Sequence, residues 1–98
     1  MPRAMVLNAK DNVGTLIDTV SAGERVTLTG ARTDTIEVRE GVPFGHKCAL
    51  DRIASGDDII KYGQVIGRAI HAIAPGHHVH VHNVEALRGR GDLTGDGE

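Results

Sequence analysis

Aromatic side chains are almost absent from this sequence, because Phe44 and Tyr62 are the only phenylalanine, tyrosine or tryptophan among its 98 residues. Proteins that bind single-stranded nucleic acid normally offer several aromatic rings on which bases stack. The formal net charge of −2 also provides no basic field that would attract a phosphate backbone. We therefore expect no nucleic-acid partner.

Cysteine and long apolar runs are scarce as well. A single cysteine, Cys48, excludes an intrachain disulfide and a cysteine-based zinc knuckle. No apolar run approaches the roughly 20 residues of a membrane-spanning helix. The segment 1–4, Met-Pro-Arg-Ala, lacks the apolar stretch of a signal peptide. The sequence thus predicts a cytoplasmic protein without membrane contact.

The length limits what the chain can enclose. With 98 residues it has room for one compact domain, which buries about two-thirds of the surface of the unfolded chain. A deep catalytic cavity walled by this chain alone is not expected. Residues 88–98 contain four glycines and one apolar residue, which predicts a flexible C-terminal tail. The composition indicates part of an assembly rather than a whole enzyme.

Short strand-like runs alternate with glycine-containing turns. The turns fall at 22–24, 55–57 and 74–76, and we interpret them as recurring turn chemistry rather than a true sequence repeat. Alternating or β-branched composition predicts strands over 4–7, 25–29, 35–39, 58–63, 65–69 and 77–84. Residues 13–20 fit a strand or a short helix, and residues 50–54 fit a single helical turn. The predicted fold class is mainly β, with room for one or two short helical turns.

A run of histidines is the strongest chemical signal. If residues 77–84 form a strand, His78, His80 and His82 share one face, with neighbours about 6.7 Å apart. Two imidazoles at that spacing can meet one metal ion at about 2.1 Å each, and imidazole suits zinc, iron, copper or nickel. The alternative is a polar strand face with histidines in solvent. We favour a metal site on His80 and His82, because His77 and His78 lie nearer the turn.

A second candidate is the loop 41–47, Gly-Val-Pro-Phe-Gly-His-Lys. Its glycines and proline favour a rigid loop that presents His46 and Lys47 to a ligand. Lys47 can supply a cation for a substrate carboxylate, or act as a base if burial lowers its pKa. The alternative is that Phe44 anchors the loop while both polar residues face water. Cys48 is expected to be a buried apolar residue.

Five motifs, taken in order, carry a family resemblance. They are Asp-Asn-Val at 11–13, Ala-Gly-Glu at 22–24, Val-Pro-Phe-Gly-His-Lys at 42–47, Ile-Lys-Tyr-Gly-Gln-Val-Ile-Gly at 60–67, and Pro-Gly at 75–76 followed by His-Val-His-Asn-Val at 80–84. From Leu7 to Leu87 the chain resembles the small N-terminal domain of the altronate and galactarate dehydratases, the UxaA-type hydro-lyases. The resemblance implies a SAF-type domain with a β-clip fold over residues 1–87, with the tail at 88–98.

The resemblance also implies an activity. Such lyases remove water from a sugar acid with a divalent metal, for which Fe2+ is the expected ion. Most of the active site would then belong to a separate large dehydratase subunit. The small subunit of a sulfolactate sulfo-lyase also looks like this chain, so elimination of sulfite stays open beside elimination of water. The substrate, the metal and self-association of the chain are not decided by the sequence.

Within that interpretation each candidate residue has a role. His46, Lys47 and His82 are the catalytic candidates, Lys47 and Asn83 would bind substrate, and His80 and His82 would hold the metal together with the large subunit. One alternative is a non-catalytic SAF-type module that binds a small molecule or serves assembly. Another is a metal-handling protein that uses the histidine run.

Overall fold

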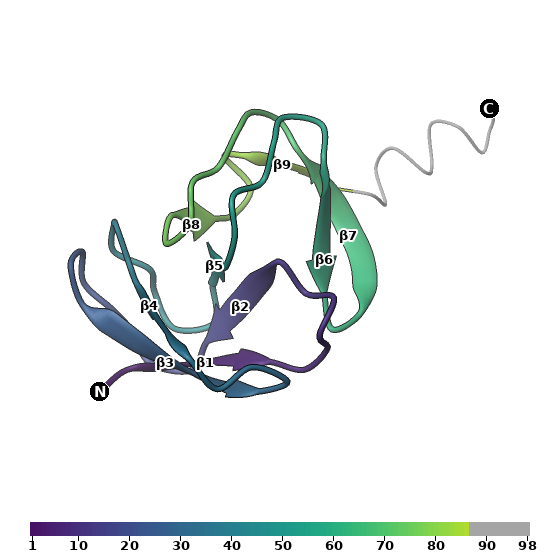
Figure 1. Cartoon of the computed structure of the whole chain (residues 1–98). Coiled ribbons are helices and arrows are strands. Elements are labelled where there is room, and N and C mark those ends of the chain that lie inside the picture. The colour runs from purple at the N-terminus through teal and green to yellow at the C-terminus, as the bar shows by residue number, and fades with distance from the viewer. Residues whose placement is uncertain (87–98) are drawn as a thin grey trace, which may run out of the picture.

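The computed structural model describes residues 1–86, and every regular element in that range is a short strand (Figure 1). The strands are β1 Arg3–Val6, β2 Val13–Leu16, β3 Arg25–Gly30, β4 Thr35–Glu37, β5 Lys47–Ala49, β6 Asp58–Lys61, β7 Gln64–Ala69, β8 His78–Val79 and β9 Val84–Ala86. The predicted mainly β fold is confirmed. None of residues 1–86 is helical, so none belongs to a helix able to cross a membrane.

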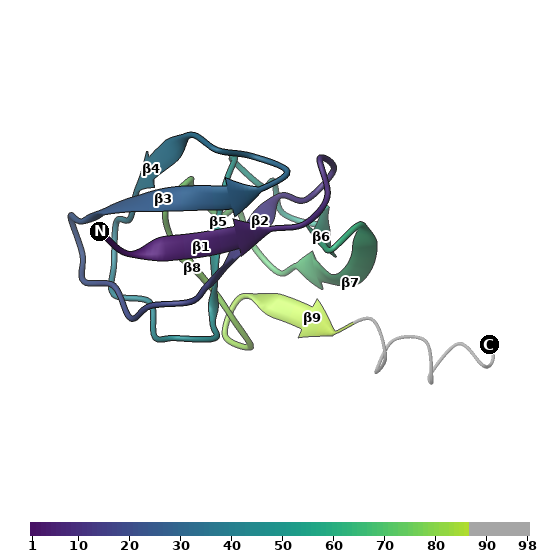
Figure 2. The ribbon, with the colours of Figure 1, turned by 90° about the horizontal axis from the view of Figure 1, so that it is seen from below.

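Six of the strands form one curled sheet in the order β4-β3-β1-β2-β5-β8. β1 and β3 are parallel, and every other neighbouring pair in this sheet is antiparallel. Figure 2 shows β1, β3 and β4 side by side at one end. β8 is therefore the edge strand at the opposite end of the sheet, where it pairs with β5 alone.

The remaining strands form a smaller antiparallel sheet in the order β6-β7-β9, on the right in Figure 1. The chain joins the two sheets through Asn12, whose side chain donates to Asp58 O at 2.8 Å and accepts from Ile60 N at 2.7 Å. These hydrogen bonds attach the start of β2 to β6. Asn12, which belongs to the motif at 11–13, thus links the two sheets.

Two apolar cores meet at β5. The first core contains Cys48 and the second contains Ala49, because successive side chains of a strand point to opposite faces. The first core consists of Ala4, Val6, Leu16, Val20, Val26, Leu28, Val38, Val42, Cys48 and Leu50. The second consists of Val13, Ala49, Ile53, Ile59, Ala69, Ile73 and Val79. Cys48 is fully buried, as predicted.

The glycine turns recur four times. Gly23, Gly45, Gly56 and Gly76 all have positive φ, at 89°, 84°, 88° and 83°. In each turn the amide that follows the glycine donates to the carbonyl three residues earlier, as in His46 N to Pro43 O at 3.0 Å. Glycine adopts this backbone without the steric cost of a side chain. Three of these turns were predicted, and the fourth lies inside the predicted loop 41–47.

Two local predictions were wrong, and one open alternative is decided. The strand predicted over 77–84 ends at Val79, since the chain turns through residues 80–83 and Asn83 N donates to His80 O at 3.1 Å. The helical alternative for 13–20 is replaced by β2, and 50–54 contains only a bridge from Ile53 to Ile73. In both segments pairing with distant backbone outweighs local helix formation. The predicted strands at 4–7, 25–29, 35–39, 58–63 and 65–69 are confirmed with small changes at their ends. The tail predicted at 88–98 lies outside the described residues.

Candidate functional site

Strand register explains why three histidines meet. β5 and β8 are antiparallel, with Cys48 opposite His78 and Lys47 opposite Val79. Continuing this register by one pair places His46 opposite His80, just beyond the ends of both strands. Since alternate residues share a face, His46, His78 and His80 all lie on the face of Cys48. We call these three residues the histidine cluster.

The rings of the histidine cluster are in direct contact. His46 Nδ1 and His78 Nε2 are 2.9 Å apart, which is a hydrogen bond when one nitrogen carries the proton. The rings of His46 and His80 stack with centroids 3.9 Å apart and an interplanar angle of 16°. One ligating nitrogen from each of the three rings lies within 4.8 Å of the other two. The three half-buried side chains could therefore hold a metal ion.

His82 lies to one side of this cluster. Its ring centroid is 5.2 Å from that of His78, and the two rings are tilted by 45°. His82 lines a cavity of about 380 Å³ whose other lining residues are Glu40, His71, Ala72, Ile73, Ala74, His77 and Asn83. The turn at 80–83 removes His82 from the face that a continuous strand would have given it. The metal pair predicted on His80 and His82 remains a prediction, and the described geometry instead groups His80 with His46 and His78.

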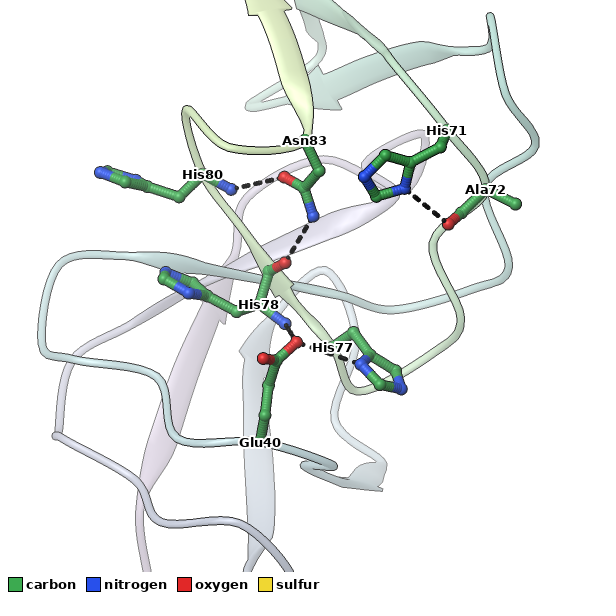
Figure 3. A network of polar contacts seen from close by, with 7 residues as sticks. All are labelled: Glu40, His71, Ala72, His77, His78, His80 and Asn83. Atoms are coloured by element: carbon green, nitrogen blue, oxygen red, sulfur yellow. Dashed lines mark hydrogen bonds and ion pairs between the residues drawn. The ribbon is translucent and has the colours of Figure 1, made fainter.

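Asn83 closes the turn that carries His80. Its side chain is buried, its Oδ1 accepts from His80 N at 2.9 Å, and its Nδ2 donates to His78 O at 2.8 Å (Figure 3). Figure 3 shows the side chains of His78 and His80 extending to the same side of the turn. The substrate contact predicted for Asn83 remains a prediction. Its position shows that this amide holds the backbone of two cluster histidines.

Glu40 holds the start of β8 from the other direction. Its Oε2 accepts from His78 N at 3.0 Å and lies 3.0 Å from His77 Nδ1 (Figure 3). Partial burial, the largest single influence, acts to raise the pKa of Glu40, but these contacts with His78 and His77 lower it overall. Glu40 therefore stays ionised as an acceptor for β8. No sequence motif singled out Glu40, because its partners are 37 and 38 residues away.

Lys47 supplies the cationic part of the site. It borders a cavity of about 190 Å³ that is also lined by Ile66, His80, Val81, Val84 and Ala86. Burial lowers the pKa of Lys47, and the nearby charge of Lys61 lowers it further. The described contacts give the Lys47 ammonium no carboxylate partner. Such a half-buried cation is suited to an anionic ligand.

The electrostatics favour neutral imidazoles. Burial is the main cause that lowers the pKa of His78, followed by the charges of His46, His82 and His80. The pKa of His80 is lowered in the same direction by burial, then by His46 and Lys47. Neutral imidazole can ligate a metal, whereas imidazolium cannot.

The sequence-based hypothesis grouped His46 and Lys47 with His80, His82 and Asn83, and it set His78 aside as nearer the turn. The structure places His78 within the histidine cluster. The signal that could have identified His78 is the pairing of the segment 46–48, His-Lys-Cys, with the segment 78–80, His-Val-His. That pairing is between segments 32 residues apart, so local periodicity does not contain it.

Comparison with known proteins gives the relationships of this chain. Residues 2–87 match the family model described as the altronate/galactarate dehydratase SAF domain. The chain is 40% identical over 88 residues to the (2R)-sulfolactate sulfo-lyase subunit alpha of Chromohalobacter salexigens, an alignment that covers 86% of this chain and 94% of that one.

Two longer relatives show the same domain within a larger protein. The altronate dehydratase of Escherichia coli is 42% identical over 77 residues, which is 79% of this chain and 15% of that protein. The altronate dehydratase of Bacillus subtilis is 39% identical over 79 residues, which is 81% of this chain and again 15% of the relative. The chain thus spans about one seventh of these dehydratases. It belongs to the altronate/galactarate dehydratase SAF-domain family.

Proposed function

We propose that this chain is the small subunit of a lyase that acts on a 2-hydroxy acid, and that a separate larger subunit completes the active site. The observation that carries the proposal is that Lys47 and His80 line one cavity of about 190 Å³, while the ring of His46 stacks on that of His80. A relative named as a subunit alpha matches this chain over 94% of its own length, which supports a small-subunit role.

The reaction class fits the groups present. Elimination next to a carboxylate removes the α-proton, places negative charge on the carboxylate side as an enediolate, and releases hydroxide or sulfite from the neighbouring carbon. The enol product then becomes a 2-oxo acid. Cations that face the carboxylate stabilise the charge that develops, and a histidine that has taken up a proton can give it to a departing hydroxide.

Each candidate residue has a stated role in this proposal, and His82 and Asn83 have two. Lys47 pairs with the substrate carboxylate or sulfonate, His46 and His82 transfer protons, and Asn83 adjoins the substrate while it holds the turn. His80 and His82 face the larger subunit and share a divalent metal with it, for which Fe2+ is the expected ion. When bound, that ion would polarise the carboxylate and hydroxyl oxygens of the substrate.

The test is to isolate the tagged chain from its native cells, identify co-purifying polypeptides by mass spectrometry, and assay the complex. The assay offers altronate, galactarate and (2R)-sulfolactate separately, and measures 2-oxo acid and sulfite. We expect a larger dehydratase-like polypeptide and turnover of one of these acids. The Lys47→Met complex should show a KM raised by at least about tenfold, because an interaction with the substrate anion is lost.

Matched variants make the assay specific. Lys10→Met removes an exposed lysine and should leave turnover at the wild-type level. His82→Ala should reduce kcat and the bound metal. If His82→Ala keeps both at wild-type levels, the role given to His82 is wrong. A chain that captures no larger polypeptide and eliminates nothing from the three acids is instead a non-catalytic SAF-type module.

A further inference from the structure

We infer that His46, His78 and His80 form a site for a first-row transition-metal ion that this chain completes by itself. The site goes beyond the proposed function, in which the metal is shared with a larger subunit through His80 and His82. It also differs in its residues, since His78 replaces His82 as a ligand. When His46 ligates the ion, proton transfer is left to His82. The supporting observation is that one ligating nitrogen from each of the three rings lies within 4.8 Å of the other two.

The spacing of the first two ligands already matches a coordinated pair. Nitrogens bound at about 2.1 Å to one ion are separated by about 3.0–3.4 Å in octahedral and tetrahedral geometry. His46 Nδ1 and His78 Nε2 are 2.9 Å apart, with a proton between them. Replacing that proton by the ion requires only a small separation of the two rings. Strand register holds both residues in place, because β5 and β8 are paired at Cys48 and His78.

The third ligand needs a change of ring orientation. The His80 ring lies over that of His46 at 3.9 Å between centroids, so its nitrogen lone pairs lie in a plane nearly parallel to the His46 ring. Binding requires the His80 ring to tilt toward the ion. The half-buried ring borders the cavity of about 190 Å³, which provides room for the tilt. Asn83 holds only the backbone amide of His80, so the turn need not change.

The donor set decides the class of ion. Three neutral imidazoles without carboxylate or thiolate favour zinc, nickel, copper, cobalt or iron, and disfavour magnesium and calcium, which prefer oxygen. The positive charge of Lys47 beside His80 opposes binding of any cation, so the nitrogen ligands must outweigh it. Three protein ligands on an open face leave at least one coordination position for water or an anion.

The test uses the whole 98-residue chain without a polyhistidine tag and without any partner, after removal of metal with a chelator. Zn2+ is titrated by calorimetry, Co2+ by its visible absorption, and Mg2+ serves as the ion that should not bind. We expect one equivalent of Zn2+ with a micromolar or lower Kd. His46→Gln, His78→Gln and His80→Gln should each weaken binding by more than about tenfold, whereas His71→Gln and His77→Gln should leave the Kd within about twofold.

A second readout needs no substitution. In the wild-type chain, Zn2+ should shift the imidazole NMR signals of the three cluster histidines together and leave the His71 signal unchanged. Binding that is weak and equally sensitive to His71→Gln would show adventitious binding by surface histidines and overturn the inference. So would a loss caused by His82→Gln but not by His78→Gln, since that result assigns the metal to His80 and His82.

The two proposals fail separately. A chain that binds no metal alone, but whose complex with a larger subunit eliminates water or sulfite, overturns the self-contained site and leaves the lyase function standing. A chain that binds Zn2+ through the histidine cluster but captures no larger subunit supports the self-contained metal site and overturns the lyase function. The metal site then belongs to a protein outside the lyase reaction.

Discussion

Asn83 provides the sharpest test of how the turn presents the histidine cluster. The side chain is only 4% exposed, yet both of its polar atoms bond to backbone groups of cluster residues. Oδ1 accepts from His80 N at 2.9 Å, and Nδ2 donates to His78 O at 2.8 Å. Asn83→Ala removes both hydrogen bonds and leaves a backbone amide and a carbonyl without these partners.

The expected loss follows from the cost of unsatisfied polar groups. Each buried donor or acceptor left without a partner costs about 1–3 kcal/mol. His78 and His80 are half-buried, so water can reach part of the released backbone, and we expect a total of about 2–4 kcal/mol. In a domain of this size 1 kcal/mol corresponds to about 4–8 °C, so Tm should fall by about 8–32 °C.

Urea denaturation followed by circular dichroism measures this loss, since the chain has no tryptophan for fluorescence. Asn83→Asp keeps an acceptor for His80 N and loses the donor to His78 O, so its loss should be smaller than that of Asn83→Ala. Asn8→Ala is the matched control, because the Asn8 side chain accepts one exposed hydrogen bond, from Lys10 N at 2.9 Å. It should cost less than about 1 kcal/mol. An Asn83→Ala variant within about 0.5 kcal/mol of the wild type would refute the role of this amide.

Three further outcomes are expected. Gly76→Ala should destabilise the domain by more than about 2 kcal/mol in urea denaturation, because a Cβ at φ 83° would lie 2.2 Å from Glu37 O. Gly23→Ala, at φ 89° with nothing within 4 Å of its added Cβ, should cost only about 1 kcal/mol, and equal losses would contradict this reasoning. Burial raises the pKa of the Cys48 thiol from 9.0 to about 11, so the native thiol should react with iodoacetamide at pH 8 far more slowly than the thiol of the urea-unfolded chain. A native thiol that reacts as fast as the unfolded one would show that Cys48 is accessible. The contribution of the raised Cys48 pKa to the stability of the fold is complete below pH 9 and decreases as the pH rises toward 11. The lowered pKa of Glu40 stabilises the fold at pH values above the ordinary carboxyl pKa of 4.5, and this stability is lost as the pH falls through the lower pKa of the folded state. The stability of Glu40→Gln should therefore depend less on pH in that acid range. An unchanged acid profile in Glu40→Gln would exclude that contribution.

Much of the fold follows from local sequence. The alternation of polar and apolar residues in Arg25–Gly30 gives a half-buried strand wherever it pairs, and glycine at Gly23, Gly56 and Gly76 is compatible with the positive φ that each turn needs. These are properties of a few consecutive residues. Sequence reasoning could therefore predict a mainly β domain, most of the described strands and the turns at Gly23, Gly56 and Gly76.

The histidine run shows where local reasoning ends. Its alternation predicts one strand over 77–84, but Asn83 bonds back to His80 and to His78, and the chain turns after Val79. The alternation of polar and apolar residues is the same whether Asn83 closes a turn or lies on a strand, so the pattern does not distinguish the two. The choice is made by burial of Asn83 between the two backbone segments, which exists only in the folded molecule.

The sequence by itself determined the ingredients of the site, which are imidazoles, one lysine and no paired acid, together with the β class of the domain. Only the tertiary structure decided which histidines meet. His46 and His78 are 32 residues apart, and their nitrogens approach to 2.9 Å because β8 pairs with β5 in one particular register. A shift of that register by one residue would send alternate side chains to the opposite face. The cores on both sides of β5 exclude such a shift, because it would expose Val79 and bury its polar neighbours.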